Sequence, residues 1–478
     1  MTGIILEPSM GLTRILRFYY INISAFVTWK RHARQNVPAR VAGFVACLFM
    51  LPSASIAEAW VFQPSIRLEG IYEDNFRVVP DAPAGGQQGP QQVTTARISP
   101  ALRLSRVTET MDIAGLLRVD GDFFFGDAQN LENQSNQLAD FSAFKKGELS
   151  RWGGILSYRR DTLLRTIGPI QAPTDPSINE EEDVDEGLSR ANVRRQRLSL
   201  GPSWSRYLTE RTQIGLSYEF SDVSLSDVPA FNPNDVSTQL TDYYTHRVGT
   251  YLLTQVTERD QLPLIFAGRR YIADNEARSN SYQLEAGVVH KFSETTSGTF
   301  TLGGIYSTFD RPATVSNPGN GSNSDIAFTL AGTKRTELTN FSGVVQRTTT
   351  PSVSGNLVLT NQAIFNVSRL LTERTRFIFR SRIFDTEAVD ELDSSSNRRY
   401  LSLQPTLRYE LSPSWGLETS YQYIHQKRFS DVDSADDNAI SISLVYQRPT
   451  IVEPEPPVQD IGVGSLGRLG GLGGLSIE

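Results

Sequence analysis

Apolar and polar side chains alternate along most of the chain beyond residue 59. From Met111 to Phe125 the odd-numbered residues are apolar or small, whereas the even-numbered residues include Asp112, Asp120 and Asp122. Successive side chains of a β-strand point to opposite faces, so this pattern predicts strands with one apolar and one polar face. The same alternation recurs in segments 213–221, 282–291, 401–410 and 440–446. No run of 18 apolar residues follows residue 59, so we expect no transmembrane helix.

The connections between these segments alternate between short and long. The short polar joints lie at 108–110, 145–148, 208–212, 257–260, 293–296, 334–336, 371–375 and 411–414. The longer polar segments are 74–94, 126–135, 161–192, 224–242, 272–280, 309–324, 387–397 and 428–437. This asymmetry is typical of outer-membrane barrels, which have short periplasmic turns and long extracellular loops. We therefore predict an all-β, closed antiparallel transmembrane β-barrel of about 18 strands, or 16 to 18, because Ser342 to Leu359 is poorly patterned.

Four tryptophans support the same orientation. Trp60 begins the first strand, and Trp152, Trp204 and Trp415 each lie close to a short joint. Bilayer interfaces collect amphipathic aromatic rings. We therefore expect these side chains to form an aromatic girdle at the periplasmic surface of the membrane.

The segment before residue 60 has the organisation of a secretory signal. Basic residues are followed by the apolar run 41–51 and then by Ala57, Glu58 and Ala59. We expect cleavage after Ala59, with Ala57 and Ala59 as the recognised small residues. A membrane anchor is the alternative, but an apolar run of about 12 residues is shorter than the roughly 20 of a spanning helix. The only cysteine, Cys47, lies in this segment, so the mature chain is expected to contain no disulfide.

The chain is therefore expected to have three parts. Residues 1–59 are the N-terminal extension and signal peptide, residues 60–447 form the barrel, and residues 448–478 are a flexible tail rich in proline and glycine. Gly462 to Gly467 has the letters of a dinucleotide-binding loop, but it lacks the strand and the helix that make such a loop function. We expect no cofactor there.

Several functional classes receive no support from the sequence. A net charge of −7 argues against nucleic acid as a partner. The histidines are scattered without metal-ligand spacing, and no nucleophile elbow occurs, so we predict neither a metal site nor an enzyme. A hydrolase built from residues that meet only in space stays open as an alternative. The acidic residues of 180–186 and 431–437, Asp185 among them, are expected to be solvated in external loops.

Arginines on the polar parity of the strands are the candidate functional residues. An arginine facing lipid near the bilayer midplane costs about 2–4 kcal/mol, so these side chains should face the lumen, where they would attract anions. The candidates for a substrate path are Arg195, Arg197, Arg376, Arg380, Arg382 and Arg408. Salt bridges inside the lumen are the simpler interpretation. The carboxylates considered for them are Asp120, Asp122, Glu219, Glu285 and Glu410.

The first two strands carry a family resemblance. The chain from Trp60 to Asn75 reads WVFQPSIRLEGIYEDN, and Ile98 to Leu104 reads ISPALRL. Together they resemble the opening of outer-membrane β-barrel porins associated with exopolysaccharide export and PEP-CTERM systems. The motifs span about 45 residues, and the tail after Tyr446 departs from the usual aromatic barrel ending.

The resemblance implies an outer-membrane location and a role in passage of polysaccharide. We expect a porin-like channel for export or diffusion of carbohydrate, in which tyrosines such as Tyr243 and Tyr271 stack on sugars. The expected partners are outer-membrane lipid, the barrel assembly machinery, polysaccharide and export-complex proteins. A structural or adhesive barrel that displays its extracellular loops without transport is the alternative.

Overall fold

The computed structural model describes residues 60–80, 89–126, 133–163, 185, 192–228, 240–310, 320–389, 397–428 and 433–447. The described residues form 18 strands. They are β1 (Val61–Glu73), β2 (Val93–Val107), β3 (Met111–Phe125), β4 (Gln134–Lys146), β5 (Ser150–Thr162), β6 (Arg194–Thr209), β7 (Thr212–Ser226), β8 (Tyr243–Gln255), β9 (Asp260–Ala273), β10 (Arg278–Ser293), β11 (Thr296–Asp310), β12 (Asn320–Arg335), β13 (Thr339–Ser352), β14 (Asn356–Thr372), β15 (Thr375–Ala388), β16 (Arg398–Ser412), β17 (Trp415–Arg428) and β18 (Ala435–Gln447). Among the described residues, no helix is long and apolar enough to cross a membrane.

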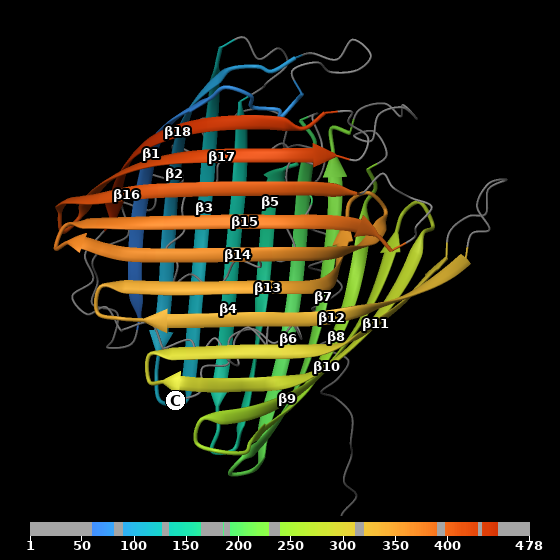
Figure 1. The fold of residues 1–478 in the computed structure, drawn as a ribbon. Coiled ribbons are helices and arrows are strands. Elements are labelled where there is room, and N and C mark those ends of the chain that lie inside the picture. Colours follow the sequence, from blue (N-terminus) through green and yellow to red (C-terminus); the bar gives the residue numbers. More distant parts are fainter. Residues whose placement is uncertain are drawn as a thin grey trace, which may run out of the picture. The chain divides into compact units, whose positions relative to one another are not determined.

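The sheet closes on itself. Each strand pairs antiparallel with the next, and β1 also pairs with β18 from Ser65 opposite Gln447 to Glu73 opposite Ala439. In Figure 1 the blue first strands therefore lie beside the red last ones. Beyond the ladder, the side chain of Asp437 accepts a hydrogen bond from the backbone amide of Asn75 at 3.1 Å. The prediction of a closed antiparallel barrel of about 18 strands is confirmed.

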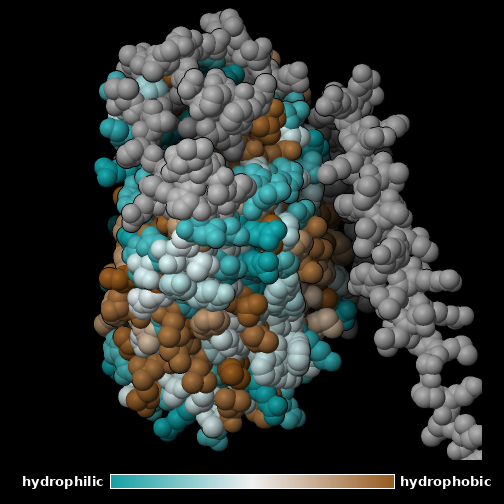
Figure 2. Space-filling view, turned by 90° about the vertical axis from the view of Figure 1, so that its right-hand side faces the viewer, coloured by the Kyte–Doolittle hydropathy of each residue, from teal (hydrophilic) through white to brown (hydrophobic). Residues whose placement is uncertain are grey.

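The outer face of the wall is apolar and the inner face is polar. Leu284, Leu330 and Ile442 each expose more than half of their surface, whereas Glu285 and Thr301 are almost fully buried. Figure 2 shows apolar side chains gathered over the lower part of the wall. This arrangement is the reverse of a soluble protein and suits a wall that contacts hydrocarbon. The barrel lies in the outer membrane.

The eight predicted short joints all connect consecutive strands, and threonine side chains shape several of them. Thr257 Oγ1 accepts hydrogen bonds from the backbone amides of Arg259 at 3.1 Å and Asp260 at 2.9 Å. In both copies of the Leu-Thr-Glu-Arg-Thr sequence, the first threonine accepts from the arginine amide two residues later. Threonine favours such turns because its hydroxyl replaces a backbone partner. The tight hairpins thus follow from local side-chain chemistry.

Two connections at the opposite, long-loop end differ from expectation. The predicted loop 272–280 shrinks to four residues, because β9 continues to Ala273 and β10 begins at Arg278. The unassigned region 342–359 contains another connection, the tight turn between β13 and β14. Gly355 adopts a φ of 89° there, a conformation that L residues with a side chain rarely adopt. This turn settles the strand number at 18.

The tryptophans lie at the short-turn ends and point outward. The rings of Trp152 and Trp204 are 5.7 Å apart on neighbouring strands, and Trp415 lies 5.1 Å from Tyr446. Trp152 exposes 59% of its surface. The predicted signal segment, with Ala57 and Ala59, lies outside the described residues, as does the predicted tail 448–478.

The outer half of β13 separates from its neighbour β12. The ladder between β12 and β13 ends at Phe328 opposite Arg347, whereas β13 continues to Ser352 paired with β14. Every residue of β13 from Thr348 onward is buried, so neither face of this stretch contacts lipid. Leu359 of β14 packs against the inward-facing Ile305 and Ala327 of β11 and β12. The tip of the hairpin therefore folds inside the wall, while β14 stays paired with β15 from Val358 opposite Ala388 onward.

Candidate functional site in the arginine-lined lumen

The six predicted arginines lie on the inner face of two strand groups. On β6, Arg195 and Arg197 are 1% and 8% exposed, while Leu198 and Leu200 on the other parity are 41% and 49% exposed. On β15, Arg376, Arg380 and Arg382 share the parity of the buried Phe384. Arg408 of β16 stands opposite Arg376. Arg376 is exposed, close to the short joint at the end of the barrel.

Several inward-facing arginines stand directly opposite one another. In the described strands, four cross-strand positions pair arginine with arginine: Arg159 with Arg197, Arg247 with Arg269, Arg376 with Arg408, and Arg398 with Arg428. Directly opposed Cβ atoms in a sheet are about 4.5–5.5 Å apart, and like charges at such positions destabilise the pairing. Three of these pairs contain arginines that the sequence analysis did not single out.

Neighbouring carboxylates and rings offset part of this repulsion. Glu418 of β17 lies 3.5 Å from Arg408 and 2.7 Å from Arg67 of β1. Arg398 lies over the ring of Phe384, 4.8 Å from its centroid. Arg408 thus shares its carboxylate partner with Arg67, and Arg398 packs on an aromatic ring.

The two basic groups lie on opposite walls. Strands β6 and β15, which carry five of the six candidate arginines, are nine places apart in a ring of 18. Guanidinium groups therefore lie on two sides of the barrel interior. Topology, and not closeness in sequence, places these residues around the same interior.

Two of the five carboxylates considered in the sequence, Asp122 and Asp120, form salt bridges, but their partners are Arg97 and Arg118 and not the candidate arginines. Arg97 bonds to Asp122 through Nε at 2.5 Å and lies 3.7 Å from Glu69. Glu285 instead accepts hydrogen bonds from Gln283 and Thr301. Glu410 is exposed near a short joint. Simple salt bridging therefore accounts for part of the lumen, chiefly around β1 to β3.

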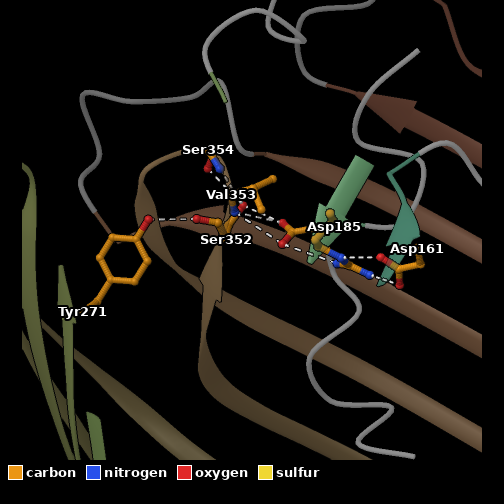
Figure 3. A network of polar contacts seen from close by, with 7 residues as sticks. Asp161, Asp185, Tyr271, Ser352, Val353 and Ser354 are labelled. Carbon is orange, nitrogen blue, oxygen red and sulfur yellow. Dashed lines mark hydrogen bonds and ion pairs between the residues drawn. The ribbon is translucent and has the colours of Figure 1, made fainter. Parts of the chain in front are cut away.

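Asp185, which lies between β5 and β6, contradicts the expectation of a solvated loop. It is fully buried and accepts a hydrogen bond from the hydroxyl of Ser352 at 2.8 Å. The backbone amide of Val353 donates to both carboxylate oxygens at 3.3 Å. Arg195 Nη1 lies 4.0 Å from Asp185, while the same guanidinium forks onto Asp161 at 2.9 and 2.7 Å. Figure 3 shows this network at the tip of the β13–β14 hairpin.

An apolar cluster surrounds the hairpin tip. Val353 and Leu357 belong to one buried group with side chains from or beside β5 to β9 and with Val389. Its other members are Leu163, Val193, Val223, Tyr243, Tyr271, Ala273 and Ala277. Tyr243 and Tyr271 are 3% and 0% exposed, with rings 5.0 Å apart. Because both rings are buried beside the hairpin tip, the expectation that these two tyrosines stack on sugars is wrong in this structure.

The acidic residues near the end of the chain also differ from expectation. Asp436 and Asp437 belong to β18 and are not loop residues. Asp436 contacts His425 and Tyr423 on the neighbouring strand at 2.7 Å, and Asp437 is fully buried. These carboxylates are structural. Among the described residues, no group of three histidine, cysteine or acidic side chains is placed to hold a metal ion.

No family model and no curated protein sequence matches this chain. Among solved structures, the chain is similar to OpdQ from Pseudomonas aeruginosa, with 10% identity, a TM-score of 0.39, and coverage of 82% of this chain and 100% of OpdQ. It is also similar to OccAB2 from Acinetobacter baumannii, with 11% identity, a TM-score of 0.40, and coverage of 81% and 98%. A protein described as a bacterial polysaccharide outer membrane secretin gives 9% identity, a TM-score of 0.31, and coverage of 80% and 98%. The substrate has to be argued from the residues of this chain.

Proposed function

We propose that this chain forms a porin-like channel for the export or diffusion of acidic carbohydrate across the outer membrane. The observation that carries the proposal is the set of arginine pairs facing one another inside the closed wall. A guanidinium binds a carboxylate or phosphate group through two parallel hydrogen bonds. Paired guanidiniums on opposite walls therefore suit a chain that carries repeated acidic groups.

The existing carboxylate neighbours favour passage over tight binding. Arg408 already shares Glu418 with Arg67, so an acidic group of the solute exchanges partners instead of meeting an isolated charge. Conduction requires sites that are favourable enough to enter and weak enough to leave. The resemblance of the first two strands to export-associated porins supports carbohydrate as the solute. Polysaccharide and export-complex proteins are its proposed partners.

Sugar entry into liposomes tests this function. We expect liposomes with the purified barrel to admit galacturonate faster than galactose, which has the same ring without the carboxylate. Replacing Arg376 and Arg408, one of the opposed pairs, by glutamine should remove that preference. Arg270→Gln is the matched control, because Arg270 lies on the exposed, outward parity of β9. Equal entry of both sugars into wild-type liposomes would contradict an acidic substrate.

A barrel that displays its loops without transport is the second candidate. It is favoured by the β13–β14 hairpin, whose tip packs against the opposite wall. Display without transport predicts that neither sugar enters, even when Thr350 to Leu357 are replaced by a shorter turn. Entry through that shortened variant would support a channel.

A further inference from the structure

The tip of the β13–β14 hairpin is attached to the side of the barrel formed by β5 to β9 through polar contacts as well as through the apolar cluster around Val353 and Leu357. The amide of Thr241, just before β8, donates to the carbonyl of Val353 at 2.9 Å. The hydroxyl of Tyr271 on β9 donates to the carbonyl of Ser352 at 3.0 Å. Asp185, which lies between β5 and β6, accepts hydrogen bonds from the hydroxyl of Ser352 and the backbone amide of Val353. The tip is thus held by three separate segments.

The surroundings of Asp185 form a carboxylate site. The donors are one hydroxyl, one backbone amide and the guanidinium of Arg195, and the electrostatic field of Arg197 adds to them. Charged and neutral donors converging on two oxygens are the usual means by which proteins bind carboxylates. Here the occupant is supplied by the chain itself.

We propose that this is a binding site for carboxylate groups of the permeating acidic carbohydrate, and that Asp185 occupies it to hold the hairpin closed. An incoming carboxylate competes with Asp185 for Arg195 and for the donors of Ser352 and Val353. Once Asp185 is displaced, the hairpin tip loses its contact with this carboxylate, and Thr348 to Leu357 moves away from β5 to β9 while the rest of β14 stays paired with β15. This inference rests on the proposed function, because it assumes that an acidic solute reaches the lumen.

The attachment of the hairpin allows such a movement. Beyond Arg347, β13 has no ladder to β12, and β14 has no ladder to β15 before Val358, so Thr348 to Leu357 joins the ladder of the wall only through the rest of β14. On the other side the tip meets β9 and β10 through a few hydrogen bonds, such as Ser281 Oγ to Thr349 Oγ1 at 3.1 Å. A ligand shifts such an equilibrium by its differential affinity for the two states.

Thiol labelling measures release of the tip without relying on transport. Val353 is 0% exposed, so Val353→Cys should react slowly with a membrane-impermeant maleimide. We expect tri-galacturonate to raise the labelling rate about tenfold and neutral maltotriose to leave it unchanged. Ile424→Cys, fully buried in another cluster, is the control and should not respond. Equal labelling of Val353→Cys with and without tri-galacturonate would overturn the proposal.

Two substitutions test the role of Asp185. Asp185→Ala removes the acceptor for Ser352 and Val353, so Val353→Cys should label fast without sugar and respond little to tri-galacturonate. Glu181→Gln, an acidic residue of the same predicted loop, should behave like the wild type. Slow labelling in Asp185→Ala would show that Asp185 does not hold the hairpin.

A disulfide connects the movement to conduction. Ser281→Cys with Thr349→Cys ties the hairpin to β10, whereas Ser281→Cys with Ser307→Cys, whose hydroxyls are 3.2 Å apart, joins β10 to β11 within the wall. Oxidation should abolish channel openings only in the first variant, and reduction should restore them. Openings that persist in the oxidised first variant would overturn the gate. Faster labelling without any current would instead overturn the channel function while leaving the carboxylate site standing.

Discussion

The hydroxyl of Ser352, at the end of β13, donates a 2.8 Å hydrogen bond to the carboxylate of Asp185, which lies 167 residues earlier in the chain. The two residues come from opposite sides of the ring of strands. Their contact lies at the tip of the β13–β14 hairpin, beside the apolar cluster that contains Val353 and Leu357.

An arginine on the outward face of the wall should destabilise the barrel most near the middle of a strand. Leu284, in the middle of β10, is 54% exposed and faces away from the lumen. Leu284→Arg should lower the free energy of unfolding from lipid vesicles by about 2–4 kcal/mol. Leu411→Arg, at a short joint, should lower it by about 1 kcal/mol or less, because it lies at the interface. Urea titration measures both, and equal losses would contradict the apolar belt.

The buried ion pair between Arg97 and Asp122 should contribute more to the free energy of unfolding than the partly exposed pair between Asp112 and Lys146. The two side chains are 2% and 0% exposed, so Asp122→Ala leaves a buried guanidinium without its main partner. We expect a loss of about 3–5 kcal/mol in the free energy of unfolding. Asp112 meets Lys146 at 3.1 Å, but its side chain is 26% exposed. Asp112→Ala should therefore lower the free energy of unfolding by no more than about 1 kcal/mol.

Closure of the barrel can be tested at the seam. Leu68 of β1 stands opposite Leu444 of β18. Cysteines at these two positions should form a disulfide in the folded protein and give an altered migration after complete unfolding. Leu68→Cys with Ile440→Cys is the control, because Ile440 stands opposite Tyr72 instead. Failure of the first pair to cross-link, or equal cross-linking of both, would be inconsistent with the register.

The contact between Asp185 and the hairpin should weaken as the pH rises. Burial raises the pKa of Asp185 above its ordinary value of 3.8, while Arg195, Ser352, Arg197 and the Val353 amide act in the opposite direction. The docked state then binds the proton more tightly than the released state. Protonation of Asp185 therefore adds to the stability of docking; this contribution is fully present below pH 3.8 and is lost as the pH rises through the raised pKa.

Single-channel recording across this range provides the measurement. The groups that face Asp185 are Arg195 and Arg197, with Asp161 paired to Arg195, and the hairpin offers only neutral donors. The frequency of openings should therefore rise with pH in the wild type. Asp185→Asn, which cannot titrate, should show no such rise. A frequency of openings in the wild type that falls as the pH rises would contradict this prediction.

The sequence was sufficient to predict the wall because each strand carries its own signal. Outward residues such as Leu284 and Ile442 alternate with inward polar ones, and the threonine joints mark each hairpin locally. The inward parity of the arginines on β6 and β15 followed from the same rule. Their roles in transport stay a prediction.

The hairpin and its contact with Asp185 could not be predicted in this way. Thr348 to Ser352 show no alternation because both faces of β13 are buried there, one against other strands and one inside the lumen. The absence of a pattern in 342–359 was the only local signal. Asp185 resembled its acidic neighbours in the sequence, and only the fold distinguishes it, by bringing Ser352 and Arg195 to it.

We propose that arginines line the path taken by solutes, and the reversal potential of single channels tests this most directly. The chain as a whole has a net charge of −7, so a path governed by its overall charge would favour cations. In a potassium chloride gradient we expect a reversal potential of the sign set by chloride, which becomes smaller when Arg376 and Arg408 are replaced by glutamine. A reversal potential of the sign set by potassium would show that the arginines do not govern the path.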